Sequence, residues 1–224
     1  MDTLTAEDVS ELDGLEDWRV LIRSLHATFR TGSLAEGIAF ATRVGAAADA
    51  ADHHPDLDLR YFRTSVVLTT HSADGLTELD VDLARTISAI AAELGLTPEP
   101  ALVSVQEIAI DALDIPAVLP FWRAVLGYDD DMPPEFEGDA DALGDPVNGN
   151  PAVWFQQMDA ARPQRNRIHI DVWVPLDAAE ARVQAALDAG GTLVSAHSAP
   201  SFWVLADPEG NEACVCTAFG RPRD

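Results

Sequence analysis

The chain of 224 residues contains no lysine, and its fourteen basic residues are all arginine against thirty-eight acidic ones, giving a formal net charge of −24. A surface this acidic repels phosphate backbones and anionic lipid headgroups unless a local basic patch offsets it. The sequence contains no such patch. We therefore expect neither a nucleic-acid nor a membrane partner, and instead small molecules or further copies of the chain.

Long apolar runs, a leader sequence and paired cysteines are also missing. No apolar stretch approaches the roughly 20 residues of a membrane-spanning helix, and residues 1–11 are acidic and polar where a secretory signal has a basic start and an apolar middle. Cys214 and Cys216 are the only cysteines, and they lie one residue apart on an expected strand, which gives no disulfide framework. We expect a soluble protein of a reducing cytoplasm.

The length allows two domains of about 100 residues, each with its own core. Two prolines within residues 96–100 break the hydrophobic pattern and mark a boundary. We therefore assign residues 1–14 to a flexible acidic N-terminus, 15–96 to a first domain, 97–102 to a linker and 103–220 to a second domain.

Hydrophobic periodicity in the first domain predicts the order strand, strand, helix, strand, strand, helix. The expected strands are 18–23, 26–30, 57–61 and 65–70. Two capping boxes open the expected helices, in which a hydroxyl and a carboxylate satisfy free backbone N–H groups; they are Ser33 with Glu36, and Thr77 with Asp80. The first of these helices is expected to run to about Ala51 and to be ended by His53-His54-Pro55, because the residue before a proline is pushed out of the helical region.

The second domain shows a strand followed by a helix twice, about sixty residues apart, which suggests an internal duplication. The first copy has a strand at 103–110, a helix at 114–127 and a strand at 153–156, with an acidic loop at 129–150. The second copy has a strand at 167–174, a helix at 177–189, and strands at 192–195, 202–206 and 212–217.

Three of the six histidines, His53, His54 and His71, fall at element ends of the first domain and are expected to converge at one edge of its sheet. Imidazole titrates near neutral pH and both takes and gives protons, as a dehydration requires. The alternative is structural: His53 and His54 complete a helix C-terminus, where a cation is favoured, and His71 is a solvated strand end.

The stretch Asp49-Ala-Ala-Asp-His53-His54-Pro55, followed by Tyr61, His71, Gly75-Leu-Thr77 and Asp80, resembles the signature of pterin-4a-carbinolamine dehydratases. The similarity extends from about residue 15 to residue 94. It implies an α+β fold, with a two-layer α/β sandwich on an antiparallel sheet, and assembly into a homodimer or higher homo-oligomer. It also implies a lyase that removes the 4a-hydroxyl of a 4a-hydroxytetrahydropterin, giving the quinonoid dihydropterin without a metal or cofactor.

The same resemblance implies roles for individual residues. His53 and His71 become the acid–base pair, and His54 binds the pterin or shares the proton transfer. Asp80 either contacts the ring or orients His53, or it is only half of a capping box, and Tyr61 is either a substrate contact or a core aromatic. The residues expected to bind substrate are Asp80, Tyr61, Pro55 and Thr70.

Four segments of the second domain resemble the glyoxalase-like, vicinal-oxygen-chelate superfamily: 112–114, 121–128, 169–171 and 207–211. This resemblance implies paired βαβββ modules that form a cupped sheet around a ligand or metal site. Five aromatic residues either line an apolar pocket for a flat ligand or fill the core; they are Trp154, Phe155, Trp173, Phe202 and Trp203.

Metal-binding members of that superfamily place His or Glu on the first strand of each module and Glu on the last. Here these positions fall on Glu107, His169 and Cys214, and the fourth ligand would be Gln156 by a guess. All three can bind zinc, but a buried thiol is more often a small hydrophobe. We therefore expect no metal, and a divalent metal at this site is the alternative.

We expect an active pterin dehydratase with an accessory glyoxalase-like domain, and keep two alternatives. The second function is a non-catalytic dimerisation or small-molecule-binding protein on the same fold. The third is a lyase, isomerase or dioxygenase-like enzyme with its chemistry in the second domain, since a fold does not fix a function.

Overall fold

The computed structural model describes residues 2–116, 142–145, 149–160, 168–188, 191–206 and 212–221. The chain divides into two compact units, Met1–Val103 and Ser104–Asp224, and each is described by itself. None of the helices within these ranges is long and apolar enough to cross a membrane.

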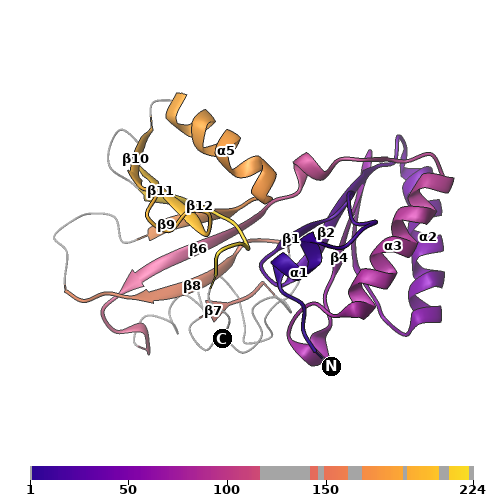
Figure 1. Ribbon diagram of the computed structural model, residues 1–224, viewed down its shortest axis with the longest axis horizontal. Coiled ribbons are helices and arrows are strands. Elements are labelled where there is room, and N and C mark those ends of the chain that lie inside the picture. Colours follow the sequence, from indigo (N-terminus) through magenta and orange to yellow (C-terminus); the bar gives the residue numbers. More distant parts are fainter. Residues whose placement is uncertain are drawn as a thin grey trace. The chain divides into compact units, whose positions relative to one another are not determined.

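The first unit contains an antiparallel sheet with the strand order β1-β2-β4-β3 (Figure 1). The strands are β1 (Arg19–Leu21), β2 (Ser24–Arg30), β3 (Asp56–Arg60) and β4 (Arg63–Leu68). They match the expected strand pairs within a few residues. Ile22 takes a positive φ of 57° in the tight turn between β1 and β2.

Two helices, α2 (Leu34–Ala51) and α3 (Glu78–Glu93), lie side by side against one face of this sheet (Figure 1). Their apolar sides pack on the sheet in a single core, in which the rings of Phe29 on β2 and Phe40 on α2 meet edge to face at 5.3 Å. The first unit is thus the expected two-layer sandwich of helices on an antiparallel sheet.

The start of the chain corrects the expectation of a flexible N-terminus at residues 1–14. A short helix, α1 (Ala6–Ser10), begins with a complete capping box between Thr5 and Asp8. Leu4 pairs with Leu76 through a backbone bridge, and Val9 is 3% exposed within the core of the unit. The acidic side chains of this segment lie on its exposed side, and its apolar side chains pack against the rest of the first unit.

Residues 97–102 are not a free linker either. Strand β5 (Thr97–Pro98) pairs with β2, and the short helix η2 (Pro100–Leu102) follows it. Between them, Glu99 accepts hydrogen bonds from Arg30 and Arg63 at the end of the sheet. The segment therefore belongs to the first unit.

The end of α2 lies at the expected residue, but its cause differs from the expectation. The helix stops at Ala51 because Asp52 adopts a left-handed conformation with φ of 51°. Pro55 lies beyond that point and does not end the helix. At the other end, Ser33 accepts from the N–H of Glu36, but the reciprocal half of this capping box is not formed.

The described residues of the second unit form a seven-stranded sheet with the order β10-β11-β12-β9-β6-β8-β7 (Figure 1). The strands are β6 (Val105–Ala112), β7 (Ala142–Leu143), β8 (Ala152–Gln157), β9 (Ile168–Trp173), β10 (Thr192–Ser195), β11 (Phe202–Ala206) and β12 (Glu212–Cys216). Helix α5 (Leu176–Asp188) packs against β11 and β12, and apolar side chains of all three elements form one core. The sequence β9-α5-β10-β11-β12 is the expected βαβββ order.

Some expectations fall on residues that the structure does not describe. These are most of the expected helix 114–127 and of the loop 129–150, together with the segments 121–128 and 207–211. Each of them lies outside the described residues.

Candidate active site

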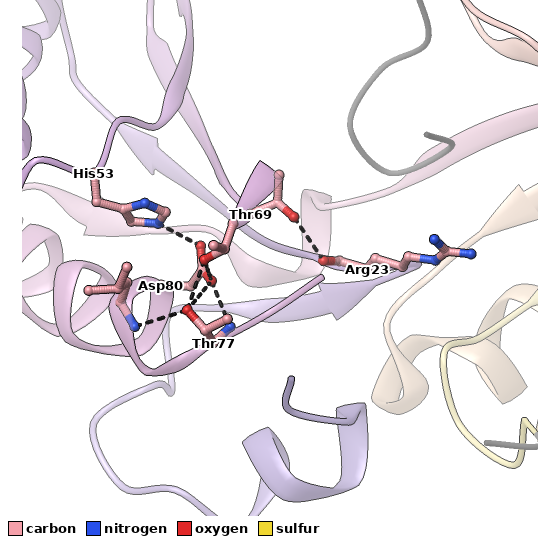
Figure 2. Close-up of polar contacts among 7 residues, drawn as sticks. Arg23, His53, Thr69, Thr77 and Asp80 are labelled. Carbon is pink, nitrogen blue, oxygen red and sulfur yellow. Dashed lines mark hydrogen bonds and ion pairs between the residues drawn. The ribbon is translucent and has the colours of Figure 1, made fainter. Parts of the chain in front are cut away.

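A buried histidine–aspartate pair joins the end of α2 to the start of α3 in the first unit (Figure 2). Nε2 of His53 lies 2.7 Å from Oδ1 of Asp80. His53 is 8% exposed, and Asp80 is fully buried. The second carboxylate oxygen of Asp80 accepts from the hydroxyl of Thr70 at 2.7 Å and from the backbone N–H of Thr77 at 2.8 Å.

The local sequence explains why Asp80 sits there. Thr77 caps α3, and Asp80 returns the capping bond to the backbone N–H of Thr77. One carboxylate oxygen is used in this box, and the other is left to face His53. Asp80 therefore completes the cap of α3 and contacts His53 at the same time.

The hydrogen bonds define where the proton lies on His53. An ionised carboxylate only accepts hydrogen bonds, and Oδ2 of Asp80 already accepts from Thr70 and from the N–H of Thr77. Nε2 of His53 is therefore the donor, and Nδ1 carries the lone pair. The contact with Asp80 uses Nε2, so Nδ1 is the ring nitrogen that this contact leaves unused.

The other two histidines are exposed and flank this pair along the chain. His54 follows His53 directly, and its Nε2 lies 3.2 Å from Oδ1 of the exposed Asp49. His71 follows Thr70 and begins the short helix η1 (His71–Ala73). It does not end a strand, because β4 stops at Leu68. Through Asp80, the structure connects the two segments that carry the three histidines.

Tyr61 is not brought to this site within the chain. It lies in the turn between β3 and β4, is 65% exposed and packs edge to face on Phe62 at 4.3 Å, so it is not a core aromatic. The five residues of β3 place it roughly 17 Å along the strand from the His53 end. Pro55 is half-buried at the near end of β3.

Asp80 and Thr70 need a corrected role as well. Because Asp80 is 0% and Thr70 5% exposed, neither presents a surface to a substrate. They contact His53, directly or through one another, and position it. Thr77 completes the same network and was missed as a site residue; its place three residues before Asp80 in a capping box was the available signal.

The second unit carries a separate polar cluster on one face of its sheet. Asp171 on β9 lies opposite Glu107 on β6 and opposite Cys214 on β12. His169 lies two residues before Asp171 and so shares this face. The ligand atoms of His169, Asp171 and Cys214 all lie within 4.8 Å of one another. Glu107 is outside this group.

Gln156, the guessed fourth ligand, is exposed on β8 and lies opposite Asp111. It is likewise outside the group. The residue that the sequence analysis missed as a ligand candidate is Asp171, although strand alternation places it on the same face as His169.

The donors of this cluster suit a transition metal. Asp171 is 7% exposed, and its Oδ1 has no hydrogen-bond partner. Burial raises the pKa of Asp171, and burial together with the Asp171 carboxylate raises the pKa of Cys214 to about 12. The thiol is thus protonated until a cation displaces its proton.

The five aromatic residues divide between the two faces of the sheet. Phe155 and Trp203 lie on the face that carries the apolar cores. Trp154 meets the ring of His169 edge to face, Trp173 lies two residues after Asp171, and Phe202 pairs with Cys216 in register. The alternation of side chains along each strand separates these two sets of aromatic residues, which the sequence pattern had grouped together.

Comparisons with known proteins divide the chain in the same way. A family model described as pterin 4 alpha carbinolamine dehydratase matches residues 2–90, and a model described as a glyoxalase-like domain matches residues 107–216. A provisionally named pterin-4-alpha-carbinolamine dehydratase of Chloroflexus aurantiacus is 45% identical over 85 residues. That match covers 91% of the relative and 38% of this chain.

Two solved structures are similar to one part of the chain each. A transcriptional coactivator/pterin dehydratase from Brucella melitensis is 32% identical, with a TM-score of 0.39, and the match covers 40% of this chain and 99% of that one. A glyoxalase/bleomycin resistance protein/dioxygenase superfamily member from Vibrio splendidus is 16% identical, with a TM-score of 0.32, over 51% of this chain and 99% of that one.

Proposed function

The chain belongs to the pterin-4a-carbinolamine dehydratase family through its first unit, and we propose that this unit removes water from a 4a-hydroxytetrahydropterin to give the quinonoid dihydropterin. The observation that carries this proposal is the hydrogen bond between His53 and the buried Asp80. It leaves Nδ1 of His53 as a proton acceptor backed by a fixed negative charge.

The reaction breaks the bond between C4a and its hydroxyl oxygen and forms a double bond between C4a and N5. The hydroxyl leaves as water with one added proton, and N5 loses one proton. We assign the removal of the N5 proton to Nδ1 of His53, because Asp80 stabilises the imidazolium that forms. His71, exposed beyond Thr70, supplies the proton to the departing hydroxyl.

His54 has a different position and a different proposed role. Its side chain is 61% exposed and its partner Asp49 is also exposed, so it is available to hold the pterin rather than to act in the buried pair. A substitution of His54 by Ala then raises KM more than it lowers kcat. This chemistry is proton transfer alone and draws on no metal or redox cofactor.

We further propose that the chain assembles at least as a homodimer. Strand β3 lies at one end of the strand order in the first sheet, and four of its five residues are exposed. An exposed edge strand presents free backbone groups that pair with another strand. Leu57 on β3, with Tyr61 and Phe62 after it, adds apolar surface there. The glyoxalase-like unit is an accessory, ligand-binding part in this account.

The test is the rate of dehydration of synthetic 4a-hydroxytetrahydropterin by the wild type and by His53→Ala, each with and without EDTA. We expect a fast wild-type rate that EDTA leaves unchanged and that falls by about 100-fold or more in the variant. His197→Ala is the matched control, since His197 is an exposed histidine of the second unit. A wild-type rate at the uncatalysed background removes the proposal.

A further inference from the structure

The cluster of His169, Asp171 and Cys214 in the second unit has no part in the dehydration. Its three ligand atoms come from the two neighbouring parallel strands β9 and β12. Register fixes their arrangement, because Asp171 and Cys214 are direct partners and His169 is two residues from Asp171 on the same strand. A rigid sheet, and not a loop, therefore holds the set together.

The burial of Asp171 is only partly offset by its neighbours. They include the thiols of Cys214 and Cys216 as hydrogen-bond donors and the guanidinium of Arg221. A buried carboxylate oxygen without a hydrogen bond is destabilising, by about 1–3 kcal/mol or more for a charged group, and Oδ1 of Asp171 is such an atom. The imidazole of His169 lies close by, with its Nε2 at 3.5 Å from Oδ1. That separation is too long for a hydrogen bond with Nε2.

The same separation is the one expected between two ligands of one metal ion. With bond lengths of about 2.0 to 2.3 Å in a tetrahedral site, two ligand atoms lie about 3.3 to 3.6 Å apart. The three ligand atoms all lie within 4.8 Å of one another, so side-chain rotation has to bring the more distant of them to that geometry.

The surroundings of His169 support this orientation. Its other ring nitrogen, Nδ1, lies 3.9 Å from Oδ1 of Asp111. Histidine ligands usually have a carboxylate behind the nitrogen that faces away from the metal, and Asp111 occupies that position here, at a distance longer than a hydrogen bond. Trp154 meets the ring edge to face and limits its rotation.

We propose that His169, Asp171 and Cys214 bind a divalent transition metal ion of the zinc class, with Asp171 as a ligand in place of Glu107. A thiolate, an imidazole and a carboxylate together select Zn²⁺ or Co²⁺ over Mg²⁺ and Ca²⁺, which take oxygen ligands. Three protein ligands leave a fourth position for water or for a small ligand with an oxygen donor. The set differs from that implied by the glyoxalase-like resemblance, which gives Glu107 as a ligand.

Direct metal binding to the full chain tests this proposal without any enzyme assay. The protein is freed of metal with EDTA and titrated with Co²⁺, a coloured substitute for Zn²⁺. We expect one Co²⁺ per chain, a cobalt–thiolate charge-transfer band in the near ultraviolet and the intense visible bands of a tetrahedral site. Zn²⁺ abolishes these signals stoichiometrically, and excess Mg²⁺ leaves them unchanged.

Two pairs of variants separate the ligands from their neighbours. Cys214→Ser loses the charge-transfer band, and Cys216→Ser keeps it, because Cys216 is a buried thiol of the same strand outside the cluster. Asp171→Asn weakens Zn²⁺ binding by at least about 100-fold, since even residues behind the ligands contribute 10- to 100-fold. Glu107→Gln weakens binding by less than about tenfold.

Thermal melting of each metal-free variant shows whether it folds. If Asp171→Asn does not fold, the comparison of Cys214→Ser with Cys216→Ser decides alone whether the cluster binds the metal. The proposal is overturned by the absence of Co²⁺ binding, by binding without the sulfur band, or by retention of that band in Cys214→Ser. It is equally overturned if Glu107→Gln weakens binding as strongly as Asp171→Asn.

Discussion

Nε2 of His53 and Oδ1 of Asp80 are 2.7 Å apart, although 27 positions separate the two residues in the sequence. The pair ties the segment after α2 to the first turn of α3. Asp80 is held by the capping box of α3 and by Thr70, so its carboxylate has one orientation. His53 therefore has one ring orientation and one available nitrogen, Nδ1.

Removing the charge of Asp80 should disable His53 without removing it. In Asp80→Asn we expect kcat to fall by about 100-fold or more with KM within a few-fold, because the amide no longer stabilises the imidazolium or fixes its tautomer. Steady-state kinetics measure both constants. Asp82→Asn is the control, since Asp82 is an exposed carboxylate of the same helix. Equal effects of the two substitutions contradict the account.

The hydroxyl of Thr70 is predicted to matter through Asp80 and not through substrate contact. Thr70→Val removes a donor to a buried carboxylate, so the free energy of unfolding should fall by about 1–3 kcal/mol, and kcat should fall with KM nearly unchanged. Thr70→Ser should restore both quantities. Thr69→Val is the matched control, because Thr69 is buried but its hydroxyl donates to the carbonyl of Arg23 (Figure 2). A change confined to KM in Thr70→Val argues for substrate binding instead.

Glu99 gives the first unit a pH-dependent contribution to stability. The guanidinium of Arg63, together with that of Arg30, holds the pKa of Glu99 below its usual value, against the opposing effect of burial. A folded pKa below the unfolded value of about 4.3 means that the contribution is present above that pH and is lost as the pH falls through the folded pKa.

Glu99→Gln should therefore lower the free energy of unfolding by about 1 kcal/mol near neutral pH. The difference from the wild type should vanish in acid. Denaturant unfolding at a series of pH values measures it. Glu93→Gln is the control, because its ion pair with Arg43 is exposed, and it should change stability little at any pH. A pH-independent difference for Glu99→Gln removes this explanation.

The first residues of the chain should contribute to folding. Val9 is 3% exposed in the core of the first unit, so Val9→Ala should lower the free energy of unfolding of that unit by about 2 kcal/mol. Val194→Ala, at a valine that is 52% exposed, should have almost no effect. If Val9→Ala leaves the unfolding transition unchanged, the packing of α1 is not a stabilising one.

Local signals in the sequence predicted the elements with strong periodicity and caps. The strand pair that became β1 and β2 and the capping box of Thr77 with Asp80 were placed correctly, because alternation and capping are properties of neighbouring residues. Val9 was misjudged because its burial depends on residues distant in the sequence. The end of α2 at Ala51 was predicted correctly, but its cause was not, because an aspartate, Asp52, adopts a left-handed conformation that glycine usually takes.

The candidate site, too, was predicted only where neighbouring residues determine it. The motif brought His53, His54, His71 and Asp80 to attention, but only the structure separates the buried pair from the exposed histidines. Tyr61 was placed by motif spacing alone, and the direction of β3 carries it away from the site.

The most direct test of the central claim is a double-mutant cycle on His53 and Asp80. The dehydration rate is measured for His53→Ala, Asp80→Asn and the double variant under one condition. If Asp80 acts through His53, the double variant is no slower than His53→Ala alone, because residues that act as a unit are not additive. A double variant whose loss is the product of the two single losses contradicts the account, since Asp80 would then act independently of His53.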